Sequence, residues 1–212
     1  MELEGPDGRR YFVSLHEDVY RPSDDTLLLA KAVHTEVKAG DRFLEVGCGA
    51  GYVSLIAAGA GAIATCTDAN PHAVVLARHN AKQNKLTVEA VETDLLAGLA
   101  GPFDVVAFNP PYLPTAPDDY VPGPLNLAFD GGPDGNTTVL RFVQQVGRLS
   151  PLPRCVLVVH SSLSDPSPLR SAMAALGYSN DVALDEAHAF ERLTVQRFTV
   201  DRSGLGPCQS GS

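Results

Sequence analysis

Three acidic residues that could bind one ligand follow short apolar runs of the sequence. They are Glu45, Asp68 and Asp94. The first opens a Gly-x-Gly-x-Gly segment, in which Gly47, Gly49 and Gly51 allow a tight turn and a close approach of a ligand to the backbone. A carboxylate at a strand end can accept hydrogen bonds from both hydroxyl groups of a ribose. Helix capping explains one such acid, but not three acids beside one glycine turn.

A second group of residues, Asn109-Pro110-Pro111-Tyr112, directly follows another apolar run. Pro110 lacks an N–H group and stiffens the turn, so the Asn109 side chain and the Pro110 carbonyl can both face a ligand as acceptors. An –NH₂ group on a planar carbon offers two matching donor hydrogens, and the ring of Tyr112 can pack over it. Ordinary turns also use Asn and Pro, but this tetrapeptide follows the glycine segment in an order that suits one shared site.

Short β-rich runs alternate with helical patterns along the chain and must position these residues. Strands are predicted over 43–46, 63–67, 88–91, 104–108, 155–159 and 193–200. Helices are predicted over 52–60, 71–84, 137–149 and 168–176. The alternation indicates a doubly wound α/β sheet with helices on both faces, whose last strand alternates apolar with polar residues and runs antiparallel. The carboxyl ends of the parallel strands then share one edge, where small ligands bind.

Length and composition fit a single globular domain. The chain has 212 residues, of which 44% are hydrophobic and 19% charged, so disorder over most of its length is excluded. We expect a mobile N-terminal segment over residues 1–12, the domain over 13–200 and a disordered tail over 201–212. The stretch 110–135 is rich in proline and glycine, and a loop of that length inside a domain is usually functional.

Charge and cysteine usage limit the partners. The net charge of −9 disfavours nucleic acid, whose phosphates attract a basic surface. The four cysteines form no Cys-x-x-Cys pair, so neither a disulfide framework nor a metal site is predicted. No apolar run approaches the roughly 20 residues that span a bilayer, and the first ten residues lack the apolar stretch of a signal peptide. We therefore expect no membrane partner and a cytoplasmic location, with the nucleus added if the organism is eukaryotic.

The glycine segment and the three acids at successive strand ends resemble the Rossmann-like class of S-adenosylmethionine-dependent methyltransferases. The alternative is a nicotinamide enzyme, but its Gly-x-Gly-x-x-Gly loop places the third glycine one residue later. The resemblance implies an α/β fold with a mostly parallel seven-stranded sheet and an antiparallel C-terminal strand. It also implies S-adenosylmethionine as the cofactor, which carries a positive charge and has no pyrophosphate to neutralise.

Two further segments, residues 19–26 and residues 129–135, join the Asn-Pro-Pro-Tyr turn in resembling the HemK family of glutamine methyltransferases. The likeness extends from about Tyr20 to Thr199 and is closest to the short eukaryotic and archaeal branch, which lacks the N-terminal helical domain of bacterial members. It implies N5-methylation of the glutamine in the Gly-Gly-Gln motif of the class I peptide-chain release factor. It further implies a heterodimer with a small zinc-binding activator subunit.

The resemblance also assigns residues to roles. The cofactor contacts are Thr26, Glu45, Gly47, Gly49, Gly51, Asp68, Asp94, Leu95 and Asn109. The substrate clamp is Asn109, Pro110, Pro111 and Tyr112, of which Asn109, Pro110 and Tyr112 act in catalysis. Among the histidines, His160 alone is a candidate for the site, because it ends a strand near it. Two alternatives share this reading: an adenine-N6 DNA or RNA methyltransferase, which clamps a flipped base in the same way, and protein-lysine methylation as a secondary activity.

Overall fold

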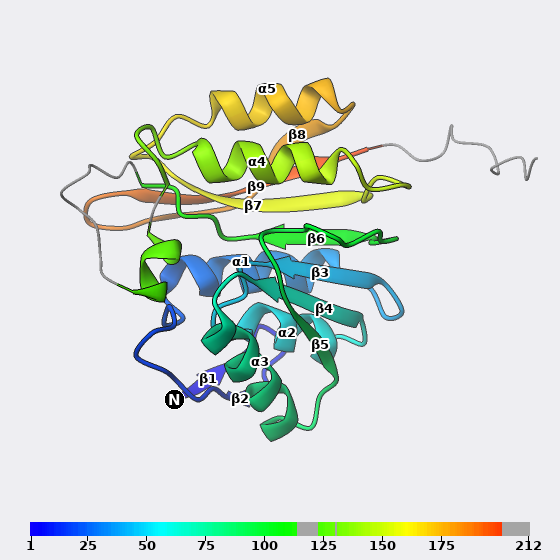
Figure 1. Cartoon of the computed structure of the whole chain (residues 1–212), viewed down its shortest axis with the longest axis vertical. Helices are drawn as coiled ribbons and strands as arrows, with labels where there is room; N and C mark the ends of the chain where they lie inside the picture. Colours follow the sequence, from blue (N-terminus) through cyan, green and yellow to red (C-terminus); the bar gives the residue numbers. More distant parts are fainter. Residues whose placement is uncertain (114–122, 130, 201–212) are drawn as a thin grey trace, which may run out of the picture.

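The computed structural model describes residues 1–113, 123–129 and 131–200, and its centre is a sheet of seven strands (Figure 1). The strands are β3 (Arg42–Val46), β4 (Ile63–Asp68), β5 (Val88–Glu92), β6 (Val105–Phe108), β7 (Cys155–Ser161), β8 (Ser179–Ala187) and β9 (Arg192–Thr199). Their order across the sheet is β5-β4-β3-β6-β7-β9-β8. All neighbours are parallel except β9, which runs antiparallel to β7 and to β8. The predicted fold class is confirmed.

Helices cover both faces of this sheet. They are α1 (Asp24–Glu36), α2 (Tyr52–Gly59), α3 (Pro71–Gln83), α4 (Thr137–Val146) and α5 (Ser167–Ala175), with a short 3-10 helix, η2 (Pro124–Ala128). Along β3, Phe43 packs into the core beneath α1 and α2, whereas Leu44 packs into the core beneath α4 and α5. All seven residues of β7 are buried, as expected for a strand covered on both faces. No helix in the described part of the chain is long and apolar enough to cross a membrane.

Among the seven strands of this sheet and the five α-helices, two elements have no counterpart among the predicted ranges. Strand β8 escaped prediction because it is mostly polar and exposed, and within it only Ala183 and Leu184 pack against the core. Its pairing with β9 holds it in the sheet. Helix α1 was also missed, although its buried leucines and alanines belong to the core. The other strands and helices lie within a few residues of their predicted ranges.

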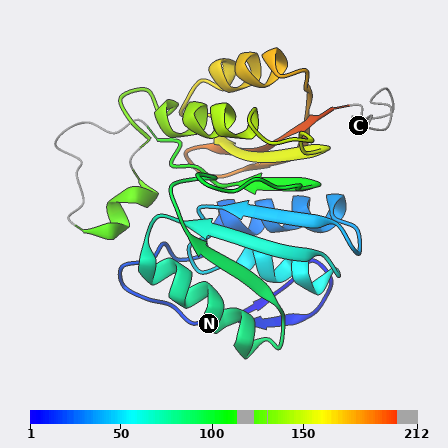
Figure 2. The ribbon, with the colours of Figure 1, turned by 45° about the vertical axis from the view of Figure 1, so that its right-hand side comes forward.

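Residues 1–12, expected to be mobile, form an antiparallel hairpin of β1 (Glu2–Glu4) and β2 (Arg10–Phe12). The side chain of Tyr11 is 2% exposed and meets Tyr52 of α2 edge-on. The backbone N–H of Phe12 donates to the Asn84 side chain over 2.9 Å, which places the hairpin beside the end of α3 (Figure 2). Motion of this segment in solution stays a prediction, and the predicted tail 201–212 lies outside the described residues.

Candidate active site

A cavity of about 840 Å³ lies at the carboxyl ends of β3, β4, β5 and β6. Its walls are the loops that follow these strands, the segment that leads into α1, and the first turns of α4. The predicted site residues that line it are Thr26, Glu45, Gly47, Gly49, Asp68, Asp94, Leu95, Asn109, Pro110, Pro111 and Tyr112. The fold therefore brings the predicted cofactor contacts, apart from Gly51, and the predicted substrate clamp into one cavity.

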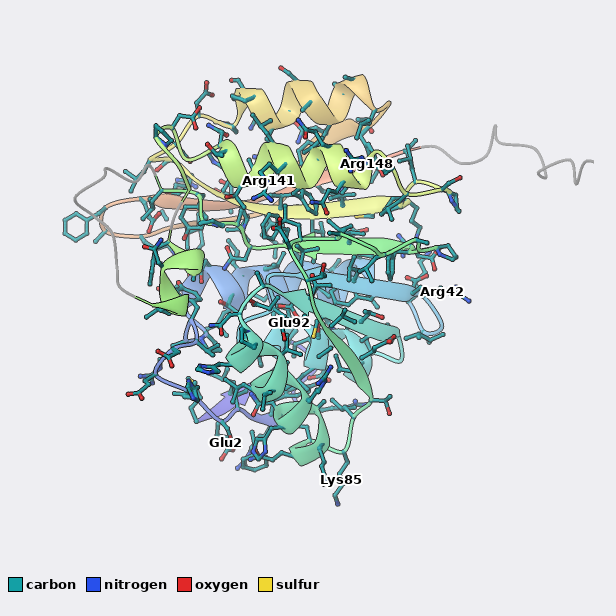
Figure 3. All side chains as sticks on the ribbon, in the orientation of Figure 1. Glu2, Arg42, Lys85, Glu92, Arg141 and Arg148 are labelled. Atoms are coloured by element: carbon teal, nitrogen blue, oxygen red, sulfur yellow. The ribbon has the colours of Figure 1, made fainter. Side chains whose placement is uncertain are left out.

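Acidic side chains dominate the described lining of this cavity. Five carboxylates contribute to it: Asp18, Asp25, Glu45, Asp68 and Asp94. Among the described lining residues the cationic side chain is Arg141 of α4 (Figure 3), and its guanidinium pairs with Asp94 at the surface. An excess of negative charge lowers the energy of a positively charged ligand in the cavity.

The glycine turn after β3 holds Asp68 against the cavity wall. Gly47 has a φ of +64°, and a Cβ there would lie 3.3 Å from the ring of Phe108, so a side chain at this position would be strained. The backbone N–H of Gly49 donates to Asp68 Oδ2 over 2.9 Å, and that of Asn70 donates to Asp68 Oδ1 over 2.8 Å. Burial raises the pKa of Asp68, and these two N–H groups oppose the rise. The carboxylate is thus fixed before any ligand binds.

Glu45 lies deeper, at the end of β3, and is 4% exposed. It accepts a hydrogen bond from the backbone N–H of Ser54 over 2.8 Å and another from the Ser54 hydroxyl. Burial raises the pKa of Glu45 to about 8, the bonds from Ser54 oppose the rise, and the negative charge of Asp68 adds to it. A cation in the cavity favours the ionised form of Glu45 and returns its pKa toward the ordinary range.

Asn109 is held by a carboxylate to which no predicted role was attached. Asp25 lies in the first turn of α1 and is 4% exposed. Its Oδ2 atom accepts hydrogen bonds from Asn109 Nδ2 (3.0 Å), the Tyr112 hydroxyl (3.2 Å) and the Tyr20 hydroxyl (3.1 Å). Its Oδ1 atom accepts the backbone N–H of Thr26 over 2.6 Å. Because an ionised carboxylate only accepts, Asp25 fixes which side of the Asn109 amide faces it.

The other end of the same amide is unsatisfied. Asn109 Oδ1 is buried and has no hydrogen-bond partner among the residues that the structure describes, while Nδ2 is taken by Asp25. A buried acceptor left without a donor costs about 1–3 kcal/mol, and a ligand N–H in the cavity relieves that cost. The site therefore fits a ligand that donates hydrogen bonds at Asn109, next to an acidic chamber that fits a cationic nucleoside.

Comparison with known proteins assigns the family. The family model "Methyltransferase small domain" matches residues 21–119. The "Putative protein N5-glutamine methyltransferase" of Methanocaldococcus jannaschii is 38% identical over 184 residues, which cover 86% of this chain and 92% of that protein. Methyltransferase HEMK2 of Mus musculus is 33% identical over 207 residues, with 93% and 95% covered. The chain belongs to the HemK family of methyltransferases.

A solved structure shares the fold of this HemK-family chain. It is the Mtq2–Trm112 complex of E. cuniculi, described as responsible for the methylation of the eRF1 translation termination factor. The TM-score is 0.70 at 22% identity, with 87% of this chain and 99% of that chain covered. At this level of identity the likeness establishes the fold.

Two predicted residues of the HemK-family site lie elsewhere, since neither is among the described residues that line the cavity. Gly51 has a φ of +77°, and a Cβ there would lie 2.9 Å from the Cβ of Ala77, so its missing side chain allows α2 and α3 to approach. His160 is buried in β7, and its Nε2 lies 3.2 Å from the Ser164 hydroxyl. Burial lowers the pKa of His160, which suits a structural neutral imidazole.

The residues that prediction missed in this HemK-family site are Tyr20, Asp25 and Arg141. Tyr20 and Asp25 belong to segment 19–26. The resemblance of this segment to the HemK family was the one feature of the sequence that pointed to them. No local pattern shows that Asp25 faces Asn109, which is 84 positions away. In the glycine-rich segment 129–135, the ring of Phe129 meets that of Tyr20 edge-on at 5.8 Å, and Asp130 lies outside the described residues.

Proposed function

We propose that this protein transfers a methyl group from S-adenosylmethionine to N5 of the glutamine in the Gly-Gly-Gln motif of the class I peptide-chain release factor. The buried, unpartnered Asn109 Oδ1 carries the proposal, because it offers an acceptor to a planar –NH₂ group. The names of the similar proteins, which refer to glutamine N5-methylation and to a termination factor, support the choice of glutamine.

The acidic half of the cavity is the place for the cofactor. When bound, S-adenosylmethionine supplies a methyl group attached to a positively charged sulfur. Asp68 would accept hydrogen bonds from the ribose hydroxyls, and Asp94 with Leu95 would hold the adenine. Gly47 and Gly49 leave the backbone open for close approach, and Glu45 would add negative charge beneath the ligand.

The clamp residues supply position and electrostatics. Asp25 holds Asn109 Nδ2, so Asn109 Oδ1 can accept one hydrogen of the substrate amide while the Pro110 carbonyl accepts the other. Tyr112, tied to Asp25 through its hydroxyl, would pack its ring against the amide plane. An amide nitrogen is a poor nucleophile, because its lone pair is delocalised into the carbonyl. Two acceptors turn that lone pair toward the reacting carbon and stabilise the positive charge that develops on nitrogen.

Adenine-N6 methylation and lysine methylation remain the alternatives to be tested. A flipped adenine also presents a planar –NH₂ group to such a clamp, but the net charge of −9 opposes binding to a phosphate backbone. A lysine ammonium is tetrahedral and does not match two coplanar acceptors. Both are less well supported than a protein glutamine.

We also propose a small zinc-binding activator subunit as partner in a heterodimer. Support comes from the shared fold with a methyltransferase that was solved as a complex with Trm112. The cytoplasm is the proposed location, with the nucleus added in a eukaryote, because the proposed substrate acts in translation.

The decisive assay offers labelled S-adenosylmethionine with release factor, duplex DNA or histone side by side, with and without the activator. We expect label on the glutamine of the release factor. The Asn109→Ala variant should lose at least about 100-fold in turnover, as expected when one transition-state hydrogen bond is removed, and should keep its cofactor affinity. Label on nucleic acid alone, or equal losses of turnover and cofactor affinity in the variant, contradicts the proposal.

A further inference from the structure

Two histidines and one aspartate converge at the rim of the cavity, outside the methyl-transfer residues described above. They are His16, Asp18 and His72, and one ligand atom from each lies within 4.8 Å of the other two. Asp18 Oδ2 is 3.0 Å from His72 Nδ1 and 3.9 Å from His16 Nδ1. A tetrahedral zinc ion binds its ligand atoms at about 2 Å, which holds them roughly 3.3 Å apart. Small side-chain rotations are therefore enough to close the cluster around an ion.

The donor atoms suit a transition metal. His16 Nδ1 accepts the backbone N–H of Asp18 over 3.1 Å, so this nitrogen is the unprotonated one of its ring, and an ion would take its lone pair in place of that hydrogen bond. The rings of His16 and His72 lie 4.7 Å apart between centroids and are tilted by 56°. Two imidazoles and one carboxylate favour Zn²⁺ over Mg²⁺ or Ca²⁺, which prefer oxygen ligands alone. The partial exposure of all three side chains leaves a fourth position for water.

The cluster also connects two parts of the cavity wall. The backbone carbonyl of Asp18 accepts a hydrogen bond from Asn70 Nδ2 over 2.7 Å. Asn70 caps α3, and its own N–H donates to Asp68. An ion bound by these residues would therefore link the segment that precedes α1 to the first turn of α3. Asn70, which contacts both Asp18 and Asp68, lies between this site and Asp68.

We propose that His16, Asp18 and His72 form a binding site for Zn²⁺ at the rim of the cavity. The site joins residues that are more than 50 positions apart in the chain, which is why no local spacing predicted a metal ligand. None of its three side chains belongs to the proposed substrate clamp, and of the three residues only Asp18 is among the described residues that line the cavity.

The test uses the full, untagged chain after treatment with a chelator. Titration calorimetry with Zn²⁺ should give one ion per chain, and Co²⁺ should give visible absorption bands of a low-symmetry site. His72→Ala and His16→Ala should weaken Zn²⁺ binding at least about tenfold, since even the loss of a second-shell partner costs 10- to 100-fold. His79→Ala is the matched control, because His79 is an exposed histidine on the same helix outside the cluster.

A thermal readout separates the site from folding defects. Zn²⁺ should raise the melting temperature of the wild type and of His79→Ala, and should raise that of His72→Ala clearly less at the same Zn²⁺ concentration. No binding to the wild type, or equal Zn²⁺ affinity in His72→Ala and His79→Ala, overturns the proposal. Both outcomes are independent of whether the chain methylates a release factor.

Discussion

The two ends of the cavity are built in different ways. At the proposed cofactor end, Asp68 is fixed by backbone N–H groups of Gly49 and Asn70, which lie 19 and 2 positions away. At the acceptor end, Asn109 is fixed by the Asp25 side chain, 84 positions away, and one oxygen of Asp25 also holds two tyrosine hydroxyls. The position of Asp68 thus depends on two backbone N–H groups, one on each carboxylate oxygen. The orientation of the Asn109 side chain, in contrast, depends on one atom of a buried side chain, Asp25 Oδ2.

This difference predicts that a substitution of Asp25 lowers turnover strongly and leaves the affinity for cofactor unchanged. In Asp25→Asn the new side chain has a donor where the native oxygen accepts three bonds, so the Asn109 amide loses the contact that sets its orientation. We expect kcat to fall about 10- to 100-fold, as for the loss of a hydrogen bond to a charged group, while the Kd for cofactor stays close to that of the wild type.

Asp24→Asn is the matched control for this experiment, since Asp24 is the exposed neighbour whose carboxylate contacts His188 over 3.4 Å. Its kcat should be unchanged. Steady-state kinetics with saturating cofactor, together with calorimetric cofactor binding, measure both variants. An Asp25→Asn chain with normal kcat, or with equal losses in kcat and cofactor affinity, removes the distinction between the two ends.

At the cofactor end the opposite pattern is expected. Asp68→Ala removes the acceptor for the ribose hydroxyls, so the Kd for S-adenosylmethionine should rise about tenfold, within the range for a hydrogen bond to a charged group. Turnover at saturating cofactor should change much less. Calorimetric titration measures the Kd, and a Kd that stays unchanged while kcat falls would place Asp68 at the acceptor end.

At Glu45 the expected effect is a pH dependence of stability rather than a change in turnover or cofactor affinity. Burial raises its folded-state pKa to about 8 from an ordinary value of 4.5, so between these pH values the folded chain holds a proton that the unfolded chain has lost. The free energy of unfolding should therefore fall as pH rises through this window, by at most about 1.4 kcal/mol per pH unit. Glu45→Gln should flatten that slope, as measured by urea unfolding at a series of pH values. A slope that the substitution leaves unchanged assigns the dependence to another group.

The parts of the site that could be predicted share one property. Glu45, Asp68, Asp94 and Asn109 each lie within two residues of the end of a strand, so the alternation of strands and helices was enough to place them at one sheet edge. Asp25 could not be placed in this way, because its contact with Asn109 is tertiary. The same reason applies to β8, which is polar and exposed and is held by its pairing with β9 rather than by a buried face.

The position of β9 has a consequence for biosynthesis. β9 lies between β7 and β8 in the sheet but is made after both, so β8 and the edge of β7 that does not pair with β6 lack their partner until β9 is made. At about 5–20 residues per second, the stretch from Ser161 to Thr199 takes roughly 2–8 s to synthesise. During those seconds β7, all of whose residues are buried in the finished molecule, exposes an unpaired edge of the kind that promotes aggregation. This half of the sheet closes last, and the nascent chain needs protection there until it does.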